Sequence, residues 1–442
     1  MIGKSCFSFF VPGGRSIFCR QIVEIASNYS ETFYTNGQSR LLKKYKQARS
    51  QDGSFGKEQA TFWNSVNKME LLPSNTVNGP DASFASILVI WQKKHGRHSL
   101  PWQNTRDAYR IWLSEIMLQQ TQVATVIPYY LRFLEVFPDV YKLAAASSDE
   151  VMKYWSGLGY YSRARNLHKC AGIVVNEYGG VFPSDPESLE KLPGIGKSTA
   201  AAIAAFSAGA KAAILDGNVV RVFSRVFGIT DSVTEKTGKN RLWKLACELL
   251  PETDIEAYTQ GLMDLGATIC VRSNPDCAKC PFSHCCVALT TGRISELPVR
   301  KTKKPSPLKK VIMLVLEYDG QILLEKRPEF GIWGGLYSLP EWEDAGGDLM
   351  NHEDEMKSLK TYVSSFGNAV SMAFLEPFVH VFSHFRLLIT PCVVALSERN
   401  MGAAEDSCVW YDFELLDEAP LPAPVRKLLN DACRQKSLKL ID

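Results

Sequence analysis

Four cysteines of the chain share one short segment and a spacing that suits metal binding. They follow the pattern Cys270-x6-Cys277-x2-Cys280-x5-Cys286, and a fifth cysteine, Cys285, lies beside the last of them. Thiolates are soft ligands for zinc or an iron–sulfur cluster, and such clustering argues against a disulfide framework. Structural zinc sites usually take their cysteines as two close pairs. The uneven spacing therefore favours a 4Fe–4S cluster, with Cys285 as a bystander.

A second motif is the run LPGIGK from Leu192 to Lys197, which small apolar residues follow. Gly194 and Gly196 allow a sharp turn between two helices and bring bare backbone amides to the start of the second helix. Those amides and the helix dipole favour an anion. The run therefore predicts a helix-hairpin-helix element that binds DNA phosphates without reading the base sequence.

Two carboxylates are candidates for catalysis. Asp216, in LDGN, precedes a predicted helix, and its alternative role is the N-cap of that helix. Glu115 lies on the flank of an apolar helical stripe, close to Trp112 and Met117. A carboxyl there should be poorly solvated, so its pKa should rise and it could act as a general acid. Periodicity alone leaves open the alternative that Glu115 is an ordinary surface glutamate.

The elements that position these residues are mostly helices. From Ala85 to about Leu289 apolar residues recur three and four apart, so residues 85–291 are assigned to an all-α domain. Prolines and basic residues then predict an extended linker over 292–310. Beyond it, short apolar runs, a hairpin signal at Asp319-Gly320 and two helical segments predict a small α+β domain over 311–438.

Length and charge set looser bounds. The 442 residues carry a net charge of +3, so a polyanion partner cannot be argued from the total. No charge-free apolar run approaches the roughly 20 residues of a membrane-spanning helix. Residues 1–84 are expected to be a poorly ordered extension, either a targeting segment or a mis-assigned start before Met69. We expect an intracellular, DNA-associated monomer, in the bacterial cytoplasm or nucleoid, with an organelle or nucleus as the alternatives.

The cysteine spacing resembles the iron–sulfur loop of the endonuclease III and adenine glycosylase enzymes. The segment LPWQNTRDAYRIWLSEIMLQQTQVATVIPYY, Leu100 to Tyr130, closely resembles the adenine DNA glycosylase (MutY) family, and the resemblance runs from about Ala85 to the C-terminal end. It implies a helix-hairpin-helix glycosylase with a Nudix-like C-terminal domain. Such an enzyme would act in base excision repair on duplex DNA and remove adenine mispaired with 8-oxoguanine or guanine. The base would first be flipped out of the helix.

The resemblance also implies roles for single residues. Glu115 would protonate adenine N7, and Asp216 would stabilise the oxocarbenium-like transition state. Asn218 matches a residue near the catalytic centre, and Gln260 matches one that reads the flipped adenine. Ser198 stands where strand-cutting relatives have a nucleophilic lysine. Attack by water, and a monofunctional glycosylase, are therefore expected.

Further matches concern DNA and the lesion. Residues that wedge into the duplex and contact 8-oxoguanine match Gln120, Thr121, Leu158 and Tyr160, while Gly194, Gly196 and Ser198 belong to the phosphate-binding hairpin. In the C-terminal domain GGLYSLPE resembles the start of a Nudix box. Leu349 and Met350 replace its required Arg-Glu, so pyrophosphate hydrolysis is not expected. Ser383, in Phe382-Ser383-His384, would contact 8-oxoguanine, with strand packing as the alternative for this trio.

Two other functions stay open at this point. An endonuclease III-like pyrimidine glycosylase with lyase activity is disfavoured by Ser198. A non-catalytic lesion-binding protein is possible if Glu115 or Asp216 lies away from the pocket. The sequence gives no indication of protein partners.

Overall fold

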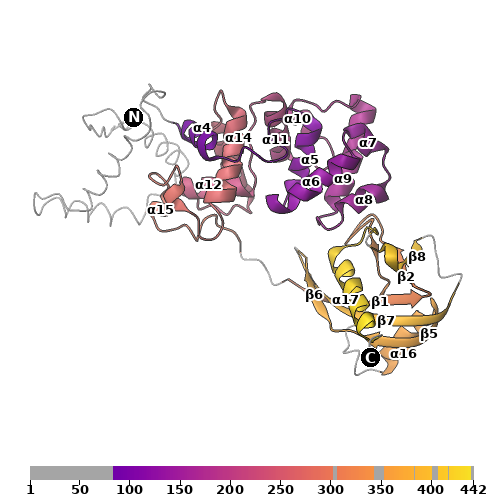
Figure 1. The fold of residues 1–442 in the computed structure, drawn as a ribbon. Coiled ribbons are helices and arrows are strands. Elements are labelled where there is room, and N and C mark those ends of the chain that lie inside the picture. Colours follow the sequence, from indigo (N-terminus) through magenta and orange to yellow (C-terminus); the bar gives the residue numbers. More distant parts are fainter. Residues whose placement is uncertain are drawn as a thin grey trace, which may run out of the picture. The chain divides into compact units, whose positions relative to one another are not determined.

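The computed structural model describes residues 83–301, 306–342, 353–382, 384–400, 407–416 and 418–439. The N-terminal extension expected over residues 1–84 lies outside the described residues, except for its last two. The described chain divides into two compact units, whose helices and strands are labelled in Figure 1. The first consists of residues 83–97 and 211–301, and the second begins at residue 98, continues to 210 and resumes after 301. The helical region 85–291 thus contributes to both units.

The first unit is built from short helices around an aromatic core. Its elements are α4 (Phe84–His95), α12 (Gly217–Val226), α13 (Lys236–Glu248), α14 (Ile255–Asp264), a π-helical turn (Leu265–Ile269), a 3-10 turn (Cys277–Lys279) and α15 (Val287–Thr290). Ser83 caps α4 by accepting a hydrogen bond from the amide of Ser86. The Phe84 ring then stacks on Phe282, with 4.3 Å between ring centroids. This contact joins α4 to the cysteine-bearing loop.

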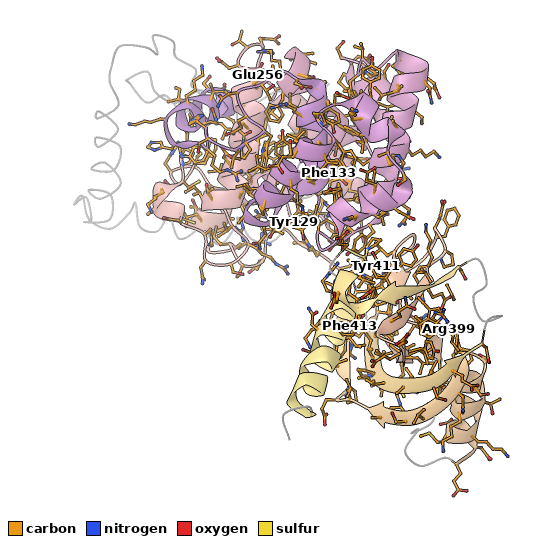
Figure 2. The ribbon with its side chains drawn as sticks, turned by 45° about the vertical axis from the view of Figure 1, so that its right-hand side comes forward. Tyr129, Phe133, Glu256, Arg399, Tyr411 and Phe413 are labelled. Atoms are coloured by element: carbon orange, nitrogen blue, oxygen red, sulfur yellow. The ribbon has the colours of Figure 1, made fainter. Side chains whose placement is uncertain are left out.

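The helical part of the second unit also follows the predicted periodicity. Its helices are α5 (Ala108–Leu118), α6 (Val123–Val136), α7 (Val140–Ala145), α8 (Ser148–Trp155), α9 (Ser162–Tyr178), α10 (Pro186–Glu190) and α11 (Lys197–Ala208). Helix α5 is the central one and packs against α6, α9 and α11. Its stripe of Trp112, Leu113 and Met117 is fully buried. Figure 2 shows Tyr129 and Phe133 on the neighbouring α6.

The C-terminal part of the second unit is a mixed sheet between two helices. Its strands are β1 (Leu308–Tyr318), β2 (Gln321–Lys326), β3 (Tyr337–Ser338), β4 (Glu341–Trp342), β5 (Gly367–Phe374), β6 (Phe378–Val381), β7 (Arg386–Arg399) and β8 (Cys408–Asp412). The main path runs β3-β2-β1-β7-β5. Strands β1 and β7 are parallel, whereas the other pairs are antiparallel. The helices are α16 (Glu353–Ser364) and α17 (Ala423–Lys439), and a 3-10 turn covers Phe413–Leu415.

The alternation of β1 explains the two faces of the sheet. Val311, Met313 and Val315 share a core with Leu428 of α17, whereas residues of the opposite parity pack with α16. The predicted hairpin is present, because Tyr318 pairs with Gln321 across Asp319 and Gly320. Both turn residues have positive φ, 46° and 73°, as a two-residue turn of this kind requires. The expected fold class, an all-α domain plus a small α+β domain, is confirmed.

The segment predicted as a linker, residues 292–310, is not extended over its whole length. Leu297 is buried, and its carbonyl oxygen accepts a hydrogen bond from Arg225 Nε at 3.0 Å. The carbonyl oxygen of Val299 accepts one from the amide of Val233 at 3.0 Å. At the other end, strand β1 already begins at Leu308. Leu297 and Val299 thus pack onto the first unit. The prolines and basic residues of this segment, on which the linker prediction was based, did not indicate this packing.

Within the described part of the chain, none of the helices has the length and apolar character needed to cross a membrane.

Candidate active site and cysteine pocket

Asp216 is the N-cap of α12 and a tightly held carboxylate. Its Oδ1 accepts hydrogen bonds from the backbone amides of Asn218 and Val219, at 3.0 and 2.8 Å. Its Oδ2 accepts one from Asn218 Nδ2 at 3.1 Å. Burial raises the pKa of Asp216, while these three hydrogen bonds and Arg221 oppose the rise. The anticipated N-cap role is therefore real, and it fixes the carboxylate in one orientation.

Arg221 links this carboxylate to the cysteine loop. Its Nη2 donates to Asn218 Oδ1 at 2.8 Å and to the Gly266 carbonyl oxygen at 2.7 Å. Its Nε donates to the carbonyl oxygen of Cys270 at 2.6 Å. Asn218 is thus held between Asp216 and Arg221. Sequence reasoning missed Arg221, although a lone basic residue on the apolar helix NVVRVF was a usable signal.

Gly266 is required by the close approach of the π-helical turn to α12. A Cβ atom at this position would lie 2.5 Å from the Cβ of Asn218. Only glycine leaves room for Asn218 here. The sequence gives no sign of this requirement, because the two residues are far apart along the chain.

Gln260, the residue matched to adenine reading, lies on α14 and is oriented by Asp264. Gln260 Nε2 donates to Asp264 Oδ1 at 2.8 Å. The Asp264 side chain is only 1% exposed, and Arg97 Nε pairs with the same oxygen at 2.7 Å. The Arg97 amide donates to the other oxygen at 2.8 Å. The Gln260 Nε2 atom is thereby hydrogen-bonded to the Arg97–Asp264 ion pair. Sequence reasoning did not find this pair.

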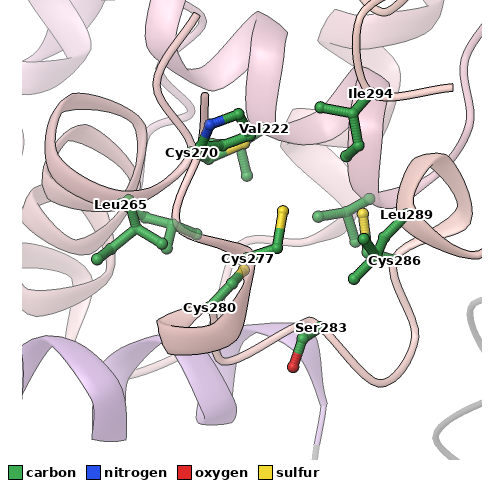
Figure 3. A pocket seen from close by; sticks show the side chains of 12 residues that line it. Val222, Leu265, Cys270, Cys277, Cys280, Ser283, Cys286, Leu289 and Ile294 are labelled. Carbon is green, nitrogen blue, oxygen red and sulfur yellow. The ribbon is translucent and has the colours of Figure 1, made fainter. Parts of the chain in front are cut away.

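The four spaced cysteines line one pocket of the first unit. Cys270, Cys277, Cys280 and Cys286 border it together with apolar residues such as Val222, Leu265 and Leu289. Figure 3 shows the Cys277 sulfur directed into this pocket. Cys285 is not among the lining residues and instead lies 3.6 Å, measured from Sγ, from the Phe282 carbonyl oxygen. Burial raises the pKa of Cys280 to about 12.

Arg225, one turn after Arg221 on α12, anchors the same loop. It is 2% exposed and donates to the carbonyl oxygens of Val271 and Arg272, at 2.7 and 3.0 Å. Its Nη1 lies 3.5 Å from Cys270 Sγ. Among the described residues, no group of three or more His, Cys, Asp or Glu side chains is gathered as for a metal ion. The cysteines surround the pocket instead of converging on one point.

In the second unit, the predicted hairpin is formed by α10 and α11. Gly194 has φ 80°, and a Cβ there would come within 2.9 Å of Asn166 Cβ. Gly196 is the N-cap of α11, so Lys197 and Ser198 fall in its first turn. Gln119 Nε2 lies 3.4 Å from the Gly194 carbonyl oxygen, which connects the hairpin to the end of α5.

Glu115 projects from α5 between the buried residues Ser114 and Ile116 and is itself half-buried. This position matches the expected flank of the apolar stripe. Glu115 belongs to the second unit, whereas Asp216, Asn218, Gln260 and the cysteines belong to the first.

The residues matched to the duplex wedge lie on two loops of the second unit. Gln120 is exposed and Tyr160 is 47% exposed. Both have positive φ, 58° and 50°, which is uncommon outside glycine. Thr121 is half-buried, whereas Leu158 is 5% exposed and packs in the helical core. The exposed aromatic ring of Tyr160 is thus carried on a turn that Leu158 anchors.

In the α+β domain, Ser383, Leu349 and Met350 lie outside the described residues. Phe382 stacks on Phe385 with 4.5 Å between centroids and also contacts Trp333 at 5.5 Å. Phe382 therefore has the packing role that was considered as the alternative for this segment. Glu341 is paired with Arg327 at 2.9 Å.

Comparison with known proteins places both parts of the chain. Residues 113–247 match the HhH-GPD superfamily of base excision DNA repair proteins, and residues 311–431 match the NUDIX domain. The adenine DNA glycosylase of Buchnera aphidicola subsp. Baizongia pistaciae is 35% identical over 351 residues, which cover 78% of this chain and 96% of that protein. The adenine DNA glycosylase of Mus musculus is 32% identical over 400 residues, with 79% of this chain and 77% of that protein covered.

Among solved structures, a thermostable thymine-DNA glycosylase is 32% identical and covers 47% of this chain and 95% of its own, with a TM-score of 0.43. The length and level of identity to the curated relatives decide the family. The chain belongs to the adenine DNA glycosylase family and is an adenine-specific DNA N-glycosylase of base excision repair, with a helical repair domain followed by a Nudix domain.

Proposed function

We propose that this enzyme excises adenine paired with 8-oxoguanine or guanine in duplex DNA, by acid-assisted hydrolysis of the N-glycosidic bond, and then releases an intact abasic strand. The observation that carries the proposal is the Asp216 carboxylate, fixed at the N-terminus of α12 by Asn218 and Val219. An anion held there can stabilise positive charge that develops on the sugar as the base departs.

Glu115 is the proposed general acid. Protonation of adenine N7 turns the base into a neutral leaving group, which lowers the barrier to bond cleavage. A half-buried carboxyl beside an apolar stripe suits this role.

Gln260 is the proposed reader of the flipped adenine. Its Nε2 atom already donates one hydrogen bond to Asp264, so the amide has a fixed orientation. The Oε1 atom can then accept from the exocyclic amine, and the second Nε2 proton can be donated to a ring nitrogen.

The absence of a lysine at position 198 supports a monofunctional reaction. Ser198 lies in the first turn of α11, where it cannot form a Schiff base with the sugar. Water therefore completes the cleavage. The Gly194 and Gly196 amides at this helix start are the proposed contacts to the DNA backbone.

Recognition of 8-oxoguanine is assigned to Gln120, Thr121, Tyr160 and Ser383, and the buried Leu158 is assigned the role of anchoring the Tyr160 turn. The exposed ring of Tyr160 suits insertion between base steps. Contacts to the lesion would offset the free energy needed to unstack those bases.

A 4Fe–4S cluster is the proposed cofactor, held by Cys270, Cys277, Cys280 and Cys286. A single tetrahedral ion needs all its thiolates within about 2.3 Å of one point, whereas among the described residues these four side chains line one pocket without gathering in that way. Four thiolates around one pocket suit a multi-iron group whose irons each take one thiolate. Its role would be to stabilise the loop next to α12, so the cluster takes no part in the glycosidic reaction.

The test uses a duplex with one A:8-oxoguanine pair. Free adenine together with an uncut abasic strand supports the proposal. Strand scission without added base or heat would favour the lyase alternative, and tight binding without adenine release would favour a non-catalytic lesion-binding protein.

A further inference from the structure

Arg163, near the start of α9, is a buried cation between the two wedge loops. The residue is 7% exposed. Within the described residues all its hydrogen-bond acceptors are backbone carbonyl oxygens and one hydroxyl. Burial lowers the pKa of Arg163 to about 10, so it stays protonated at neutral pH. A buried charge without a carboxylate is costly unless its surroundings are built to receive it.

One nitrogen of the guanidinium holds the end of α5. Nη1 donates to the carbonyl oxygens of Ile116 at 3.0 Å, Met117 at 2.7 Å and Gln119 at 2.7 Å. The first two carbonyls belong to the last turn of α5, where the helix dipole is negative. The third carbonyl directly precedes Gln120.

The second terminal nitrogen holds the second loop and also contacts the first loop. Nη2 donates to the carbonyl oxygens of Gly159 at 3.0 Å and Leu158 at 3.4 Å. It also donates to Thr121 Oγ1 at 3.1 Å. The guanidinium carbon lies 5.4 Å from the ring centroid of Tyr160. A single planar group therefore joins residues 119–121 to residues 158–160.

Each loop carries one exposed residue in a left-handed backbone conformation, Gln120 and Tyr160. A non-glycine residue keeps such a conformation only when its surroundings impose it. The acceptors of Arg163 lie immediately beside both residues. Its hydrogen bonds thus act directly beside the two left-handed residues.

From this geometry we infer that Arg163 is a positioning residue, which locks the two loops together so that Gln120 and Tyr160 enter the duplex as one preassembled wedge. The inference rests on the proposed function, because it takes the wedge role of these residues from there. An assembled wedge meets the DNA without first ordering two separate loops, which lowers the cost of base flipping.

Arginine is needed here because its planar fork serves both loops at once. A lysine has the same charge but a single nitrogen, so it can satisfy one loop only. Arg163→Lys is therefore the informative variant. Arg110→Lys is the matched control, because Arg110 is an exposed arginine of α5 that pairs with Asp107.

The experiment is a double-mutant cycle of Arg163→Lys and Tyr160→Ala, with single-turnover adenine release from an A:8-oxoguanine duplex as the readout. Arg163→Lys should slow release by about tenfold to hundredfold. Because Arg163 acts through Tyr160, the double variant should be little slower than the slower single variant. A second duplex with mismatched pairs beside the adenine should restore much of the lost rate, since opening then costs less. Arg110→Lys should keep the wild-type rate on both duplexes.

The inference is overturned if Arg163→Lys keeps the wild-type rate, if the two losses multiply in the double variant, or if Tyr160→Ala has no effect. Failure of the proposed function is a separate result, in which wild type releases no adenine from either duplex. If Arg163→Lys fails to fold, as thermal unfolding would reveal, Thr121→Val takes its place. This variant removes only one of the acceptors of Arg163. It should slow adenine release less than Arg163→Lys, and its effect should again be non-additive with that of Tyr160→Ala.

Discussion

The Asp216 carboxylate accepts hydrogen bonds from the backbone amides of Asn218 and Val219, at 3.0 and 2.8 Å. One side chain thus begins helix α12 and supplies the anion of the proposed active site. Structural and catalytic roles of Asp216 are separable, because an N-cap needs only an oxygen acceptor whereas stabilisation of a cation needs a charge.

The Asp216→Asn variant should therefore lose activity and keep its fold. Asparagine caps a helix about as well as aspartate, so the free energy of unfolding should change by less than about 1 kcal/mol. Adenine release should fall by several orders of magnitude. A large loss of stability, measured by urea unfolding, would contradict the separation of the two roles.

The pH dependence of stability follows from the raised pKa of Asp216. Its carboxyl has a higher pKa in the folded state than in the unfolded chain, because burial disfavours the charged form. The ionised group therefore costs stability at neutral pH, and this cost disappears as the pH falls through the folded pKa. Relative to Asp216→Asn, wild type should gain stability on mild acidification, with the gain complete below the unfolded value of about 3.9. Urea midpoints of both proteins at pH 7 and at about pH 4, near the unfolded value, test this, and an identical difference at both pH values would refute it.

Two adjacent cysteines provide a matched pair for the cofactor. Cys286 borders the pocket, whereas Cys285 does not. Cys286→Ser should lose most of its bound iron and visible absorption, and the helical core should unfold at a lower temperature. Cys285→Ser should keep both, because its hydroxyl can still donate to the Phe282 carbonyl oxygen. Equal iron loss in the two variants would contradict the ligand assignment.

Gly266→Ala should disturb catalysis through Asn218. The added Cβ would meet the Asn218 Cβ at 2.5 Å, so Asn218 must shift and release the carboxylate that it holds. We expect a loss of about 1–3 kcal/mol in stability from overpacking, together with slower adenine release. Gly172→Ala, in the middle of α9, is the control, since a Cβ there meets nothing within 4 Å. It should gain roughly 0.5–1 kcal/mol and keep full activity. If Gly266→Ala released adenine at the wild-type rate, the proposed role of Asn218 in holding the Asp216 carboxylate would be wrong.

Much of the fold could be predicted from the sequence, because helix periodicity, the Asp319-Gly320 turn and the Gly194 hairpin are local signals. Asp216 was also recognisable, since an N-cap is a local feature. Arg163, Arg221 and the Arg97–Asp264 pair were not, because their partners lie far away along the chain and depend on tertiary packing. The left-handed backbone of Tyr160 was equally hidden, since glycine, asparagine and aspartate indicate such a conformation in a sequence whereas tyrosine does not. Leu297 was assigned to an extended linker because its partner, Arg225, is likewise far away along the chain.

The most direct test of the account is adenine release by Glu115→Gln from a duplex with one A:8-oxoguanine pair. Glutamine keeps the shape and polarity of the side chain but cannot donate an acidic proton. Glu135→Gln, an exposed glutamate of α6, is the control. We predict that wild type and Glu135→Gln release adenine and leave an intact abasic strand, while Glu115→Gln binds the duplex with unchanged affinity and releases essentially none. Release by Glu115→Gln at the wild-type rate would contradict it.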